Sequence, residues 1–232
     1  MLRKYKIDDA NARAACVEEL DAGNIIVVPT MRWYMFLARA DRELAADRIF
    51  RLKRRPPDKS LLLVCASSNW VESTFVLTND ARRLIQSFWP GDLSMRLRWR
   101  ATTAGVTAVG VPVGLVSVAS GLMGELAAQL AAPLISTSVN FSGTPAEGGT
   151  RPAFAFEHVL TMLASSDDSS AVTVAIDGGI CPFVEATTIV DCSGSGSSVL
   201  ERPGTIHVEA IRYVVSELDV SRCRRDMAGF SS

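Results

Sequence analysis

Short apolar runs alternate with amphipathic stretches along most of the chain. Apolar runs rich in β-branched side chains are typical of buried strands, and apolar positions three or four apart are typical of one helical face. The pattern predicts helices over residues 8–22, 41–52, 79–89, 120–131, 153–164 and 208–218, and strands over residues 24–29, 60–66, 94–99, 108–113, 133–137, 171–177, 186–192 and 198–204. This alternation predicts an α/β fold with helices on both sides of the sheet.

Composition and charge exclude several classes of protein. Hydrophobic residues make up 48% of the 232 residues and charged residues 21%, as in ordinary globular proteins. The net charge of −1 gives no overall attraction for polyanions, although local basic patches remain. No apolar run reaches the ~18 residues of a membrane span, and the first residues lack the apolar core of a signal peptide. We therefore expect a cytoplasmic protein without a membrane partner.

Cysteine and histidine usage argues against a metal site. The five cysteines include no CxxC pair, and the chain has only two histidines. Scattered cysteines in odd number are typical of reduced thiols rather than of a disulfide framework. A His-based zinc site or a His-dependent triad is not expected, so no metal-ligating residues are predicted.

The stretch STSVNFSG (136–143) directly follows the apolar APLI (132–135). Small hydroxyls and exposed backbone N–H groups after a strand suit an anion, because nothing bulky blocks its approach. A polar turn explains the same composition, since Ser, Asn and Gly bond their own backbone in loops. Ser136, Ser138 and Asn140 are therefore candidates for a phosphate cradle, with the polar turn as the alternative.

A basic segment, LKRRPPDKSL (52–61), is a second candidate for phosphate binding. The proline pair stiffens the backbone behind Arg55, and a fixed guanidinium beside a lysine suits a triphosphate. A solvated charged face is the alternative. Arg202 in RPGT (202–205) and Ser94 in PGDLS (90–94) also adjoin predicted strands, and their alternatives are an ion-paired turn residue and the plain start of a strand.

Five segments, in order and spacing, resemble motifs of the YrdC/YciO family, whose best-known members are L-threonylcarbamoyladenylate synthases. The loop PLISTSVNFSG resembles the family's TSAN-x-SG loop and is the most specific match. The similarity runs from about Ile25 to about Ile206. The other matches are RIFRLKRRPPDKSLLLV (48–64) to KxRP…PL, FWPGDLSMRL (88–97) to WPGPLT, EATTIVDC (185–192) to PSTVVD, and VLERPGTI (199–206) to the RPG ending.

The resemblance implies one domain over residues 1–218, with a twisted mixed sheet and a large basic cavity, followed by a flexible tail over residues 219–232. It also implies a reaction in which bicarbonate, L-threonine and ATP give threonylcarbamoyl-AMP and pyrophosphate, with magnesium on the phosphates. The product would pass to partner proteins that modify an adenosine in certain tRNAs. Carried over by position, Lys53 and Arg55 would hold phosphates as catalytic residues. The nucleotide contacts would be Ser94, Ser136, Ser138, Asn140 and Arg202, and the amino-acid contacts Thr30 and Thr187. Arg32 is also predicted to contact the substrate, although it departs from the family motif.

The departures from the family lie near one end of the expected cavity. Where the family has PT(D/E)TVYGL, this chain reads PTMRWYMFL (29–37), and Gly110 is matched to the arginine of VxVRxP. Arg32 is then expected to replace that lost cation. Met31, Trp33 and Met35 are expected to make the pocket more apolar, with core packing of an ordinary segment as the alternative. Three interpretations stay open: the family reaction with threonine, the same chemistry on a different amine, and a non-catalytic module that binds a nucleotide or RNA.

Overall fold

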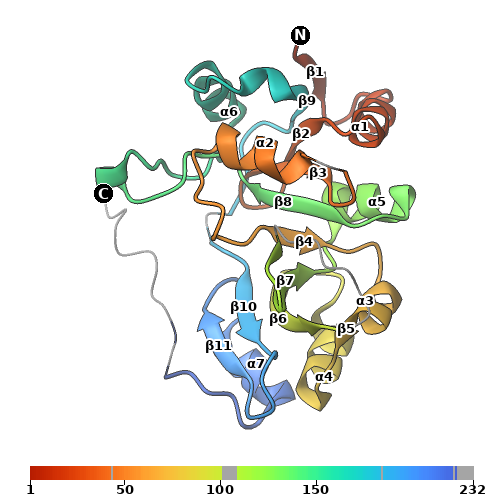
Figure 1. The fold of residues 1–232 in the computed structure, drawn as a ribbon, viewed down its shortest axis with the longest axis vertical. Coiled ribbons are helices and arrows are strands. Elements are labelled where there is room, and N and C mark those ends of the chain that lie inside the picture. Colours follow the sequence, from red (N-terminus) through yellow and green to blue (C-terminus); the bar gives the residue numbers. More distant parts are fainter. Residues whose placement is uncertain (43, 101–108, 184, 222, 224–232) are drawn as a thin grey trace.

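A computed structural model describes residues 1–42, 44–100, 109–183, 185–221 and 223. Within these ranges, one 11-stranded sheet extends along the long axis of the molecule in the order β1-β9-β2-β3-β8-β4-β7-β6-β10-β11, with β5 paired to β6 (Figure 1). The strands are β1 (Arg3–Lys6), β2 (Ile25–Pro29), β3 (Tyr34–Arg39), β4 (Leu62–Val64), β5 (Phe75–Val76), β6 (Leu93–Trp99), β7 (Val113–Ser117), β8 (Leu134–Ser138), β9 (Val172–Asp177), β10 (Thr188–Asp191) and β11 (Val199–Arg202).

The sheet is mixed, as expected. β9 runs parallel to both β1 and β2, and the pairs β4–β7 and β6–β10 are also parallel. The central pairs β2–β3, β3–β8 and β4–β8 are antiparallel. A single sheet therefore brings segments from both halves of the chain side by side, which is what a site built from distant motifs requires.

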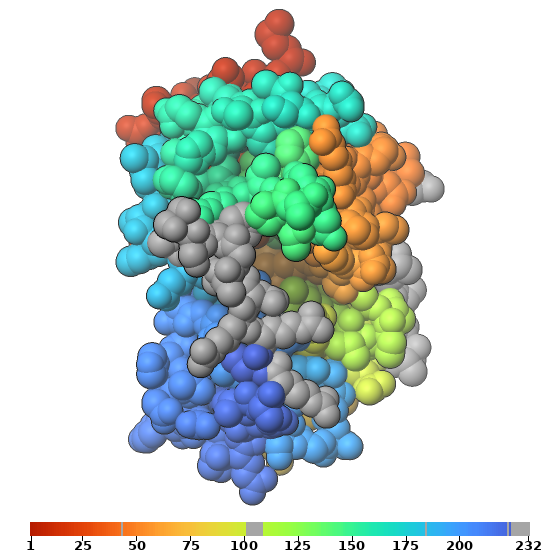
Figure 2. Space-filling model, turned by 90° about the vertical axis from the view of Figure 1, so that its left-hand side faces the viewer, coloured from red at the N-terminus to blue at the C-terminus, as the bar shows by residue number. Residues whose placement is uncertain are grey.

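Helices cover both faces of the sheet, which confirms the predicted fold class. α1 (Ala12–Asp21) and α5 (Gly121–Leu130) bury Leu20 and Leu126 in one apolar layer. α2 (Ala45–Leu52) and α6 (Phe156–Ala164) bury Ile49 and Val159 in the layer on the other face. α3 (Ser68–Thr74), α4 (Asn79–Phe88) and α7 (Val208–Val214) lie at the β6–β11 end. In the space-filling view, α6 lies at the top of the face and the residues of β11 and α7 at the bottom (Figure 2).

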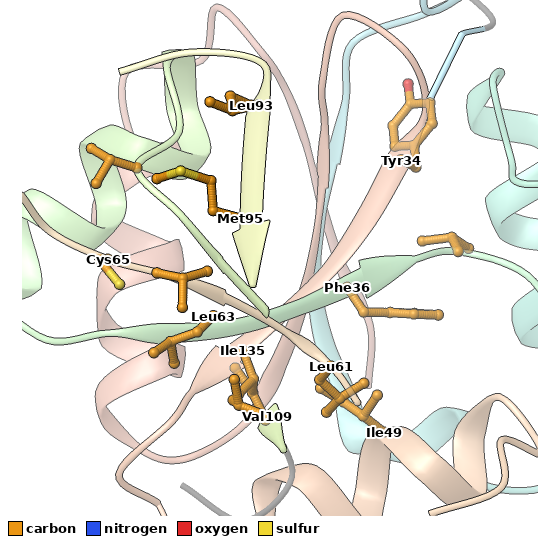
Figure 3. Packing of buried hydrophobic residues seen from close by; sticks show 14 of the residues in the cluster. Tyr34, Phe36, Ile49, Leu61, Leu63, Cys65, Leu93, Met95, Val109 and Ile135 are labelled. Carbon is orange, nitrogen blue, oxygen red and sulfur yellow. The ribbon is translucent and has the colours of Figure 1, made fainter. Parts of the chain in front are cut away.

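The centre of the sheet is fixed by closely packed apolar side chains. Phe36, Ile49, Leu63 and Ile135 are at most 1% exposed, although they come from four different elements. Figure 3 shows Leu63 and Ile135 close together, as expected for opposite residues of the antiparallel pair β4–β8, and it shows Phe36 and Ile49 in the same cluster. Burial of each such side chain stabilises the fold by roughly 1.5–3 kcal/mol. The strands beneath the candidate site are therefore rigidly placed.

Some predicted boundaries differ from the structure. The strand expected over residues 108–113 is β7, which begins at Val113; residues 101–108 lie outside the described ranges. The tail predicted from residue 219 begins with a residue that is bonded to the sheet. Asp219 N–H donates to the Ser198 carbonyl at 2.9 Å, and Leu200 N–H donates to the Asp219 carbonyl at 2.8 Å. Of the predicted tail, residues 222 and 224–232 lie outside the described ranges. No helix in the described part of the chain combines the length and apolarity needed to cross a bilayer.

Candidate functional site

A cavity of about 1220 Å³ lies on one face of the sheet. Its floor is formed by cavity-facing residues of six strands, which include Met35 on β3 and Ser138 directly opposite on β8. Leu62 on β4 likewise pairs with Ser136 on β8. Ligand pockets for a single small molecule usually measure about 300–1,000 Å³. This cavity is therefore large enough for a nucleotide together with a second small molecule.

Buried serines line the floor of this cavity. Ser94 on β6, Ser117 on β7 and Ser136 on β8 are 1%, 4% and 1% exposed. The hydroxyls of Ser94 and Ser117 have no hydrogen-bond partner in the part of the chain that the structure describes. Buried hydroxyls without a protein partner favour a bound polar group that satisfies them. The floor can therefore donate hydrogen bonds to an anion.

The first turn of α5 also opens onto the cavity. Ser120 precedes the helix without making a side-chain cap bond, and Ser120, Gly121 and Leu122 all line the cavity. The first N–H groups of a helix have no partner within the helix, and the helix dipole places partial positive charge there. Next to Ser117, this turn adds backbone donors to the hydroxyls of the floor.

The 136–143 loop is held by Lys53 from below. The Lys53 ammonium donates to the Asn140 carbonyl at 2.7 Å, to Asn140 Oδ1 at 2.8 Å, and to the Ser138 carbonyl. Ser138 Oγ donates to Asn140 Oδ1 at 2.7 Å, and Ser142 N–H donates to the Lys53 carbonyl at 2.9 Å. The loop is thus both a bonded turn and a cavity wall, because Ser138 and Asn140 line the cavity.

Lys53 itself is placed differently from the sequence expectation. It is 1% exposed, it does not line the cavity, and its three donors are engaged by the loop. Burial, with a smaller contribution from the nearby Arg55, holds the pKa of Lys53 well below its ordinary value. In this geometry Lys53 positions the loop and does not present its ammonium to a phosphate in the cavity.

Two arginines present guanidinium groups at the cavity wall. Arg55 is fixed by bonds from Nε to the Lys59 carbonyl at 3.1 Å and from Nη2 to the Ser60 carbonyl at 2.7 Å. Burial lowers the pKa of Arg55 from its ordinary value. Arg202 donates to the Thr187 carbonyl and to Thr187 Oγ1, at 2.9–3.1 Å and 3.0 Å. These hydrogen bonds fix both guanidinium groups at the cavity wall, where they can contribute positive charge.

The RPG turn beside Arg202 depends on glycine. A Cβ at Gly204 would lie 2.2 Å from the Ala186 carbonyl oxygen and 2.7 Å from the Thr188 nitrogen. Thr205 N–H donates to the Ala186 carbonyl at 3.0 Å, which holds the turn against the segment before β10. Glycine at this position therefore keeps Arg202 and Thr187 together at the wall.

The altered segment after β2 also forms cavity wall. Thr30 Oγ1 donates to the Trp33 carbonyl at 2.7 Å and accepts from the Arg32 and Trp33 N–H groups at 3.2 and 3.3 Å. Met31, Trp33 and Met35 line the cavity, as the sequence analysis expected. Thr30 thus organises the turn that presents two methionines and a tryptophan.

Arg32 lines the cavity but is not a free cation. Its Nη2 forms an ion pair with Asp92 and donates to Thr205 Oγ1 at 2.9 Å. The wall as described carries Arg32, Arg55 and Arg202 against Asp92 and Glu185. The described cavity wall thus carries three arginines and two carboxylates, and the carboxylate of Asp92 is paired with Arg32.

Gly110, which the sequence matches to the arginine of VxVRxP, is not among the described residues that line the cavity. Gly110 lies outside the cavity wall, at φ +103°, and a Cβ there would lie 2.6 Å from the Val113 carbonyl oxygen. The strand that faces the cavity is β7, whose lining residues are Leu115 and Ser117.

The structure brings nine of the ten predicted site residues to one cavity. Sequence reasoning missed Asp92, Ser117 and the start of α5. The signal for Ser117 was present, since it follows an apolar run as Ser136 does, but the strand was placed too early in the chain. The nine residues are Thr30, Arg32, Arg55, Ser94, Ser136, Ser138, Asn140, Thr187 and Arg202.

Comparison with known proteins places this geometry in a known family. The model of the Sua5, YciO and YrdC proteins, described as "Telomere recombination", matches residues 18–204. Threonylcarbamoyl-AMP synthase of Pyrococcus abyssi is 30% identical over 204 residues, which is 85% of this chain and 55% of that protein. The protein of the same name from Bacillus subtilis is 29% identical over 222 residues, which is 93% of this chain and 59% of that protein.

A solved structure has the same fold. The crystal structure of P. abyssi Sua5 complexed with L-threonine superposes with a TM-score of 0.79 at 24% identity. The match covers 100% of this chain and 65% of that chain. This chain therefore spans less than two thirds of the length of these three matches.

Proposed function

The chain belongs to the Sua5/YciO/YrdC family, and from this premise we propose that it makes a carbamoyl-adenylate from ATP, bicarbonate and an amino acid. The observation that carries the proposal is the convergence of Arg55, Arg202 and the 136–143 loop on one cavity. Two relatives named threonylcarbamoyl-AMP synthase support this chemistry, and a fold relative solved with L-threonine makes that amino acid the default amine.

The cavity supplies what phosphoryl chemistry needs. In the proposed reaction the amine and bicarbonate give a carbamate and water, and a carbamate oxygen attacks the α-phosphorus of ATP. The bond to the bridging oxygen breaks, and pyrophosphate leaves. Such a displacement needs positioning and positive charge rather than a protein nucleophile. Arg55 and Arg202 provide the charge, and Ser94, Ser117 and Ser136 provide neutral donors.

The roles of the remaining residues follow from their positions. Ser138 and Asn140 would contact the nucleotide from the 136–143 loop, and Lys53 holds this loop in place from outside the cavity. Thr30 and Thr187 shape the amino-acid end through the turns that they hold. Magnesium bound with ATP would supply positive charge to the phosphates. The described residues contain no cluster of three His, Cys, Asp or Glu side chains that could hold a metal.

The proposed product places the protein in tRNA threonylcarbamoyladenosine synthesis in the cytoplasm, where partner enzymes would transfer the threonylcarbamoyl group. Two alternatives from the sequence remain subject to test. One is the same reaction with another amine, which the apolar wall of Met31, Trp33 and Met35 favours. The other is a non-catalytic module that binds a nucleotide or RNA.

Pyrophosphate release is the direct test. Purified protein is incubated with ATP, magnesium and bicarbonate against a panel of amino acids, and the products are identified by mass spectrometry. Release with L-threonine and a threonylcarbamoyl-AMP product would support the family reaction. Release only with another amine would support the altered specificity. ATP binding without release for any amine would contradict the enzymatic proposal and favour the non-catalytic module.

A further inference from the structure

The ion pair between Arg32 and Asp92 joins three turns that surround the cavity. Arg32 lies in the turn after β2, Asp92 in the turn before β6, and Thr205 in the turn after β11. The Arg32 side chain is 7% exposed, whereas the Asp92 side chain is 45% exposed. Both residues line the cavity. The pair therefore places a buried cation behind a partly exposed carboxylate at the wall.

Each charge of this pair depends on the other. A buried arginine without a counter-charge is strongly destabilising, because removal of one partner leaves an uncompensated charge. Arg32 already has one unsatisfied group, since its Nε is buried without a hydrogen-bond partner among the described residues. Both positions also depart from the motifs that the sequence resembles: Arg32 replaces a threonine of PT(D/E)TVYGL, and Asp92 replaces a proline of WPGPLT. The two departures meet in space as one ion pair.

Asp92 changes what this end of the cavity can recognise. A carboxylate accepts hydrogen bonds and donates none, so it favours an amino acid that turns its N–H groups toward Asp92 and its own carboxylate away from it. The wall beside Arg32 is apolar: Met31 and Trp33 flank it in the chain, and Ile180 lines the same cavity. The combination favours an amine that bears an apolar group and places an N–H donor toward Asp92.

We propose that the Arg32–Asp92 pair determines which amine the protein accepts, and that it selects an amino acid with an apolar side chain larger than that of threonine. This inference rests on the proposed function and names the substrate class of the same site. Asp92 contacts the amine, Arg32 positions Asp92, and Met31 and Trp33 contact the apolar side chain.

The test compares selectivity rather than activity alone. Pyrophosphate release is measured with ATP, magnesium, bicarbonate and either L-threonine, L-leucine, L-phenylalanine or L-tyrosine. The ratio of kcat/KM for the best apolar amino acid to that for L-threonine is determined for the native protein, for Asp92→Asn, and for the double variant Arg32→Thr/Asp92→Asn. The double variant removes both charges together, so no buried charge is left unpaired. An exposed pair, Arg13 with Glu125, gives the matched control Arg13→Thr/Glu125→Gln.

We expect a ratio above one in the native protein and a fall of at least tenfold in the double variant, with the ATP Kd changed less than threefold. The control variant should retain the native ratio. An unchanged ratio in a folded double variant that still releases pyrophosphate overturns this inference and leaves the proposed function intact. No release from the native protein with any amino acid overturns both.

Discussion

Lys53 is a buried ammonium whose partners are the oxygens of one loop. Within the described residues it forms no ion pair, and its pKa lies well below the ordinary value of 10.5 because of burial. Three oxygen acceptors match the three donors of an ammonium group. These three hydrogen bonds partly offset the free-energy cost of burying Lys53. They also fix Ser138 and Asn140, which line the cavity.

Lys53→Met should destabilise the protein, because it leaves buried loop oxygens unsatisfied, at about 1–3 kcal/mol for each such group. The stability difference should also depend on pH. The folded-state pKa of Lys53 is lowered, so the unfolded state binds more protons between that pKa and 10.5. The free energy of unfolding of the native protein relative to Lys53→Met should therefore rise with pH in this window.

Urea denaturation of both proteins at several pH values between 7 and 10 measures this difference. Lys59→Met is the matched control, since Lys59 is an exposed lysine in the same basic segment. The control should leave the stability within about 0.5 kcal/mol of native at every pH. A difference for Lys53→Met that falls as pH rises would show that the burial argument has the wrong sign.

At the scale of elements, the sequence predicts those whose pattern is strong and local. The helices α1, α4 and α5 were predicted to within a few residues, because burial of one face imposes a helical period. The strands β2 and β8 were predicted because each begins with a run of consecutive buried apolar residues. No strand was predicted over β3, although YMFLAR is buried almost throughout, as β2 is. β1 was missed because RKYK is a short, charged edge strand that β9 alone holds in place.

The function of a site residue could be predicted from the sequence only where it depends on neighbours in the same segment. Arg55 and Ser136 were placed at the cavity from their own segments. The role of Lys53 could not be read in the same way, because its partners lie 85 and 87 positions away. The Arg32–Asp92 pair was also out of reach, since it depends on how turns from β2 and β6 meet across the sheet.

Gly204→Ala should disrupt the turn after β11, because the added Cβ would lie 2.2 Å from the Ala186 carbonyl oxygen. Moving two backbone segments apart costs roughly 1–3 kcal/mol, the usual cost of overpacking. The shift displaces Arg202 and Thr187, so ATP affinity should fall together with stability. Gly196→Ala is the control, because a Cβ there meets nothing within 4 Å.

Urea denaturation and ATP titration by calorimetry give the two quantities for each variant. Gly196→Ala should change stability by less than about 0.5 kcal/mol and leave ATP affinity unchanged. Native stability and native ATP affinity in Gly204→Ala would mean that the RPG turn does not set the position of Arg202.

At the scale of the whole molecule, the cavity connects both halves of the chain through one sheet. Its wall includes residues from Ile7 to Gly204, and its floor crosses β3, β8, β4, β7, β6 and β10. A ligand held by so many elements stabilises the entire fold, since those contacts disappear on unfolding. Ligand-dependent unfolding can therefore separate the enzymatic interpretation from the RNA-binding one.

ATP with magnesium, at 100 times its Kd, should stabilise the native protein by about 2.7 kcal/mol. For a chain of this size, such a change raises Tm by roughly 5–11 °C. If the arginine-lined cavity is selective for a nucleotide, ATP should raise Tm by this amount at moderate salt. A single-stranded RNA oligonucleotide should then raise Tm only slightly. The reverse pattern, a shift with RNA that disappears between 50 and 200 mM salt and none with ATP, would identify binding by counterion release. Arg55→Met should abolish the ATP shift, and Arg51→Met, which alters an exposed arginine of α2, should retain it.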